Sequence, residues 1–209
     1  GVKAVESLFP SSSNTSLISM IVVIIFLMAI NLRGMKESIK VLLPIFLGFV
    51  ITHLLIIIYG IAAHGYELPH MLSTTIQETH KAVDNSGLFY LLALLLGAYS
   101  LGSGTYTGLE AVSNNVNMLM EPRVKTGRLT MMYMAISLSV IAGGIIILFL
   151  LWHAQPNAHM TLNASVFQQI LGTSSFGHTC LVILLAFEAG LLFVGANTGF
   201  LGGPSVLSN

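Results

Sequence analysis

Residues 102–110 read Gly-Ser-Gly-Thr-Tyr-Thr-Gly-Leu-Glu, and they interrupt a segment that is otherwise largely apolar. Three glycines within seven residues weaken a helix, each by about 1 kcal/mol relative to alanine. In hydrocarbon, unwound backbone is tolerated only where protein buries it or where it lines a wet cavity. A membrane helix that breaks beside an acid, Glu110, therefore predicts a solute or ion site near the middle of the membrane.

The competing interpretation of this stretch is that its glycines only let another helix approach closely. Close packing explains Gly102, Gly104 and Gly108, but it does not explain a carboxylate at Glu110 among hydroxyl groups. The sequence therefore favours the solute site over the packing contact.

The composition is that of an integral membrane protein. Of the 209 residues, 55% are hydrophobic and only 8% are charged, and the mean hydropathy is +0.86. A soluble domain carries about 25% charged residues, so this chain has too few charges to cover a surface in water. The net charge is zero, and no overall field favours nucleic acid as a partner.

Five apolar runs are each near the roughly 20 residues that a membrane-spanning helix needs. They cover residues 15–32, 41–63, 87–120, 129–152 and 179–200, and the third is the broken one. We predict an all-α integral membrane protein with these five spans in one membrane domain over residues 1–209. The start at Gly1 and the end at Asn209 are those expected of a fragment of a longer chain.

Local signals refine these helices. Pro44 is expected in the first turn of the second helix, where its missing N–H costs nothing. Residues 202–204, Gly-Gly-Pro, are expected to follow the end of the fifth helix. Residues 69–82 are compatible with a short helix at the membrane surface.

The loops between the predicted spans differ in charge. Residues 31–40 and 121–128 each carry three Lys or Arg, whereas residues 64–86 carry one and residues 153–177 carry none. Basic loops lie on the cytoplasmic side. We therefore expect a multi-pass protein of the cytoplasmic membrane with the N-terminus of this chain outside and its C-terminus inside.

Few other residues carry candidate chemistry. Glu188 is the only carboxylate besides Glu110 inside a predicted span, and it is interpreted as a hydrogen-bonding acid between helices, with a functional role as the alternative. His53 is interpreted as a packed, neutral histidine. No histidines have a metal-ligand spacing with a carboxylate beside them, and no serine has a recognisable base. The sequence thus predicts no metal, no cofactor and no enzyme.

Three motifs resemble those of the amino acid–polyamine–organocation superfamily of transporters. Residues 31–38 (NLRGMKES) resemble the end of that family's fourth helix. Residues 107–114 (TGLEAVSN), with Glu-Pro-Arg at 121–123, resemble its sixth, and residues 195–200 (GANTGF), with Gly-Pro at 203–204, resemble the end of its eighth. The resemblance implies helices four to eight of a five-plus-five inverted repeat, in which the first and sixth helices are broken around the substrate.

The motifs are most similar to a branch with amino-acid permeases and Kim-type proton-coupled potassium importers. In the importers, the threonine and glutamate that match Thr107 and Glu110 contribute to cation binding. In the permeases, unwound backbone receives the amino group of the substrate and an aromatic side chain caps it, a role that the resemblance gives to Tyr106. Thr105 and Tyr106 replace small or apolar family residues, and glycines at 199, 202 and 203 replace bulkier ones, so the substrate stays open.

The sequence therefore predicts a secondary active transporter for a small amino acid or similar solute, working by alternating access and coupled to protons or another cation. Its predicted solute-binding residues are Thr105, Tyr106, Thr107, Gly108 and Glu110. Glu110, with Thr107, is expected to hold the cation or the coupling proton. The first alternative is proton-coupled potassium uptake, and a lesser one is a channel-like or scaffolding membrane subunit.

Overall fold

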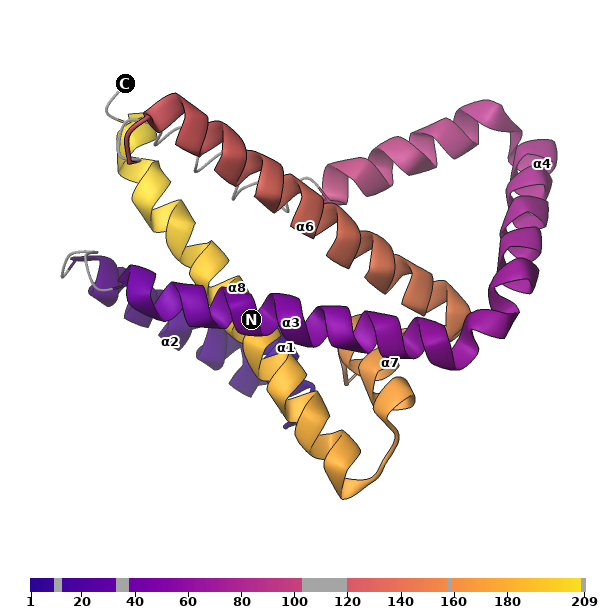
Figure 1. The fold of residues 1–209 in the computed structure, drawn as a ribbon, viewed down its shortest axis with the longest axis horizontal. Helices are drawn as coiled ribbons and strands as arrows, with labels where there is room; N and C mark the ends of the chain where they lie inside the picture. Colours follow the sequence, from indigo (N-terminus) through magenta and orange to yellow (C-terminus); the bar gives the residue numbers. More distant parts are fainter. Residues whose placement is uncertain (10–12, 33–37, 103–119, 158, 208–209) are drawn as a thin grey trace. The chain divides into compact units, whose positions relative to one another are not determined.

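The computed structural model describes residues 1–9, 13–32, 38–102, 120–157 and 159–207. Within these ranges the chain is almost entirely helical, with a single isolated bridge between Asn157 and Met160. This confirms the predicted all-α fold. The helices in Figure 1 are α1 (Val2–Glu6), α2 (Ser13–Leu32), α3 (Ser38–His64), the 3-10 helix η1 (Gly65–Glu67), α4 (Leu68–Gly102), α6 (Arg123–Leu151), α7 (Leu162–Leu171) and α8 (Ser175–Leu207).

Three described stretches are long and apolar enough to cross a membrane. They are Pro44–Gly102, Arg123–Leu151 and Ser175–Phe193. The first includes most of the predicted second span and the apolar start of the predicted third. The predicted first span falls in α2, where residues Asn14–Ala29 form a shorter apolar helix.

Two predicted helix boundaries are wrong. α3 begins at Ser38, so Pro44 lies inside the helix and not in its first turn. α8 continues to Leu207, through the Gly-Gly-Pro sequence that was expected to follow its end. The apolar run marks the part of a helix that fits the hydrocarbon, whereas the helical backbone extends beyond it. An internal proline removes one hydrogen bond of the helix. Membrane helices tolerate this loss where neighbouring groups satisfy the freed carbonyl.

The chain divides into two compact units, Gly1–Ile61 with Ile136–Asn209 and Ala62–Ala135. In the first unit, α3, α6, α7 and α8 share one hydrophobic core, and in Figure 1 the orange-to-yellow α8 crosses the purple α3. The buried residues of this core are Ile56, Ile57, Ile141, Leu148, Ala164, Val166, Phe167, Ile170, Leu181, Leu184 and Leu185.

Glycines allow close approach between these helices. Gly48 of α3 lies directly against the ring of Phe187 in α8, and Gly144 of α6 lies against Ile57 of α3. A side chain at either glycine would overlap the residue that faces it, which is the usual reason for small residues at membrane helix interfaces.

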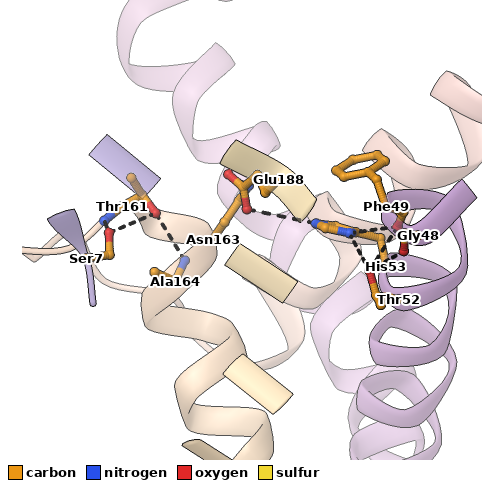
Figure 2. Close-up of polar contacts among 9 residues, drawn as sticks. All are labelled: Ser7, Gly48, Phe49, Thr52, His53, Thr161, Asn163, Ala164 and Glu188. Carbon is orange, nitrogen blue, oxygen red and sulfur yellow. Dashed lines mark hydrogen bonds and ion pairs between the residues drawn. The ribbon is translucent and has the colours of Figure 1, made fainter. Parts of the chain in front are cut away.

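The short helix α7 is fixed at its N-terminus. The Thr161 hydroxyl caps it by accepting a hydrogen bond from the Ala164 N–H at 3.3 Å, which satisfies a donor that has no partner within the helix. The Thr161 N–H in turn donates to the Ser7 hydroxyl at 2.9 Å. These bonds tie the segment after α1 to the start of α7 (Figure 2).

In the second unit, α4 bends at Gly87. This residue has φ 82° and ψ 157°, a conformation that glycine adopts at little cost. The helical segment before the bend covers the predicted surface helix at residues 69–82 and is longer than expected. None of the described residues of α4 is buried.

Candidate functional site

The predicted solute site lies outside the described residues. α4 is described as far as Gly102, the first residue of the Gly-rich stretch. The predicted site residues, all within the range 103–119, are Thr105, Tyr106, Thr107, Gly108 and Glu110. Their roles stay predictions, and so does the break in the helix.

A different polar cluster lies among α3, α7 and α8 (Figure 2). Its members are His53, Asn163 and Glu188, one from each helix. The His53 side chain is fully buried and Glu188 is 8% exposed. Ionisable groups within membrane helices are rare and usually pair with one another or line a functional pathway, so this cluster is the candidate functional site of the described residues.

The histidine has one nitrogen satisfied and one vacant. His53 Nδ1 lies 2.9 Å from the carbonyl oxygen of Phe49, one turn earlier on α3. A carbonyl oxygen only accepts hydrogen bonds, so we assign the proton to Nδ1. Nε2 of the neutral ring then carries a lone pair, and this buried atom has no hydrogen-bond partner among the described residues.

The two oxygen atoms of the Glu188 carboxylate also differ in their hydrogen bonding. Glu188 Oε1 accepts a hydrogen bond from Asn163 Nδ2 at 3.0 Å. Glu188 Oε2 is buried, and within the described part of the chain it has no hydrogen-bond partner. It lies 3.9 Å from His53 Nε2. Two vacant acceptor atoms therefore face each other between α3 and α8.

Aromatic rings border the histidine. The Phe49 ring lies over it with 3.9 Å between ring centroids, and Phe167 of α7 meets it edge-on at 5.4 Å. In such apolar surroundings charges interact more strongly than in water, and an unpaired polar group is costly. His53 is therefore held where a polar atom without a partner is costly.

The start of α1 packs against α8, where Gly1 lies against the ring of Phe193.

Sequence reasoning treated His53 and Glu188 as separate residues. The contact from Asn163 bears out the interpretation of Glu188 as a hydrogen-bonding acid between helices, but the approach of His53 was missed. The available signal was position: both residues lie near the middle of a predicted span. Two polar groups at similar membrane depth are candidates for a pair.

Comparison with known proteins gives the family. A family model described as amino acid permease matches residues 2–209. The chain belongs to the amino acid permease family. This agrees with the superfamily resemblance carried by the motifs.

The permease chain is also similar to the potassium transporter KimA of Bacillus subtilis (strain 168). The two are 28% identical over 217 residues, which cover 100% of this chain and 33% of the relative. The chain thus spans about a third of the length of this curated relative. No solved structure matches the chain.

Proposed function

We propose that the full-length protein is a secondary active transporter of the cytoplasmic membrane that moves a small amino acid or a similar solute. Coupling is to protons or another cation. The match of an amino acid permease family model to residues 2–209 carries this proposal. The basic loops favour an outside N-terminus and an inside C-terminus for this chain.

The proposed solute site is the Gly-rich stretch that interrupts the third span. Backbone groups freed at a helix break are available to bind polar solutes and ions. Thr105, Tyr106, Thr107 and Gly108 supply these backbone groups and three hydroxyls, and Glu110 supplies a charge that holds a cation or a proton.

Potassium uptake is the second candidate, and the similarity to a protein described as a potassium transporter favours it. Potassium is bound in proteins by oxygen atoms that replace its hydration shell. The Thr107 hydroxyl and the Glu110 carboxylate are oxygen donors of that kind.

An uptake screen of the full-length protein in proteoliposomes separates these candidates. Amino acids and potassium are each tested with and without a proton gradient, for the native protein, Glu110→Gln and Glu121→Gln. Glu121 is an exposed carboxylate that pairs with Arg123 at 3.0 Å, so it controls for the same chemical change. We expect Glu110→Gln to lose the dependence on the gradient and Glu121→Gln to keep it. Unaltered coupling in Glu110→Gln would remove this residue from the mechanism.

The same preparation distinguishes a carrier from a channel-like subunit. Alternating access predicts that unlabelled solute inside the vesicles accelerates the entry of labelled solute, because the loaded carrier returns faster than the empty one. A flux that does not respond to solute on the opposite side would favour the channel.

A further inference from the structure

His53 and Glu188 lack a proton between the two atoms that face each other. The Phe49 carbonyl requires a proton on His53 Nδ1, so the neutral ring offers only a lone pair at Nε2. The ionised carboxylate of Glu188 likewise offers only lone pairs at Oε2. With neutral histidine and ionised glutamate, two acceptors face each other at 3.9 Å with no donor between them.

One additional proton resolves this conflict. On Nε2 it makes an imidazolium that faces the carboxylate; on Oε2 it makes a carboxylic acid that faces the imidazole lone pair. Either arrangement gives each vacant atom a complementary partner, and a small closure of the 3.9 Å gap completes a hydrogen bond. A buried polar atom without a partner costs about 1–3 kcal/mol, so the cluster favours the state with one more proton.

We propose that His53 and Glu188, which are not among the predicted solute-binding residues, form a proton-binding site between α3 and α8. The site takes up one proton shared by the two side chains, and Asn163 orients the carboxylate by donating to Oε1. Phe49 and Phe167 border the imidazole and limit its exposure to water.

The donor set fits a proton better than a metal ion or potassium. Only one nitrogen and one oxygen are vacant, and the rings next to His53 supply no oxygen ligands. Potassium needs a shell of oxygen atoms. No three residues of the types His, Cys, Asp and Glu come close enough to hold a metal in the described ranges.

The groups that face the pair come from α7 and α6. Asn163 of α7 is neutral, and the buried core residues that α6 contributes, Ile141 and Leu148, are apolar. Asn163 donates to Glu188 Oε1 and favours the ionised carboxylate, so the pair binds its proton against this hydrogen bond.

The role of this proton in transport rests on the proposed function. When the pair holds the proton, complementary groups of His53 and Glu188 hold α3 and α8 together. When the proton is absent, two acceptors face each other at the same contact. Proton uptake therefore biases the α3–α8 interface, a contact between two helices whose relative movement would be part of a carrier cycle.

The site is tested by its own titration. Full-length protein labelled with ¹⁵N-histidine is followed by NMR between about pH 5 and pH 9, the range in which histidines titrate. We expect the His53 ring signals to report the uptake of one proton by the pair, and Glu188→Gln to lower the midpoint of that titration by about one pH unit or more, a tenfold or larger loss of proton affinity. The exposed His178 supplies the control: His178→Gln leaves the His53 midpoint unchanged.

Milder variants keep the test decisive if Glu188→Gln does not fold. Asn163→Ala removes the donor that stabilises the ionised carboxylate, so the pair holds its proton to higher pH; Glu188→Asp keeps a carboxylate and a titrating pair. A His53 signal that is independent of Asn163 and Glu188 would overturn the proposal.

Uptake assays then separate the site from the transport proposal. A shift of the pH profile of uptake in Asn163→Ala supports a coupling role for the proton. Because the NMR titration needs no substrate, it decides whether the proton site exists even if the screen finds no transported solute.

Discussion

α7 and α4 differ in burial although both belong to one apolar chain. The ten residues of α7 include four that are buried, whereas none of the described residues of the 35-residue α4 is buried. α7 has a cap at its N-terminus, an aromatic side chain in the core and a polar contact to α8. In α4 most of the large apolar side chains are exposed.

The difference shows that hydrophobicity does not decide which membrane helix face is packed. Lipid tails are as apolar as leucine, so apolar side chains gain little by leaving lipid for protein. Packing is specified instead by small residues, shape and polar partners, which are found where α3, α7 and α8 meet. The exposed face of α4 is available to lipid or to other helices of the full-length protein.

The largest expected effect comes from removing a buried aromatic ring of α7, and the removal of an exposed ring of α4 is its comparison. Phe167→Ala empties a fully buried position beside His53 and should lower the free energy of unfolding by about 3–5 kcal/mol. Phe89→Ala, on α4, removes a ring that is 85% exposed and should change it by less than about 0.5 kcal/mol. Denaturant unfolding of the purified full-length protein measures both. Equal losses would mean that the Phe89 face is packed in the whole transporter.

The second comparison inserts a side chain instead of removing one. Gly48→Leu places a side chain where the Phe187 ring already lies, whereas nothing lies within 4 Å of a side chain started at Gly97 of α4. Overpacking typically costs about 1–3 kcal/mol, and replacing an exposed helical glycine by leucine gains up to about 1 kcal/mol. Thermal unfolding in detergent should therefore show a loss for Gly48→Leu and none for Gly97→Leu. A loss for both would place a helix neighbour against Gly97.

Much of the fold follows from the sequence because the bilayer sets the length of an apolar run. Four of the five predicted spans overlap described helices, although the first overlaps a shorter apolar helix, and the third is described only up to Gly102. The errors at Pro44 and at residues 202–204 have one cause: hydropathy locates the hydrocarbon-spanning part of a helix and does not locate its backbone ends.

The candidate site was less predictable. The middle of a span gives the depth of His53 and Glu188, but the direction in which each points depends on which helices pack together. Asn163 falls in the loop predicted at residues 153–177, whereas the structure places it in the first turn of α7, from which it donates to Glu188. The Gly-rich stretch lies outside the described residues beyond Gly102. The helix break and the solute site that it predicts therefore stay predictions.

The smallest expected effect concerns single hydroxyl groups. Thr161→Ala removes the N-cap of α7, which should lower stability by about 1 kcal/mol, and Thr161→Ser keeps the capping oxygen as its control. Thr79→Ala removes an exposed hydroxyl of α4 that donates to the Thr75 carbonyl at 2.8 Å. That carbonyl is accessible to water and remains an acceptor within the helix, so the loss should be close to zero. The same unfolding experiment measures all three variants. If Thr79→Ala cost as much as Thr161→Ala, the cap would not explain why α7 is held in place and α4 is not.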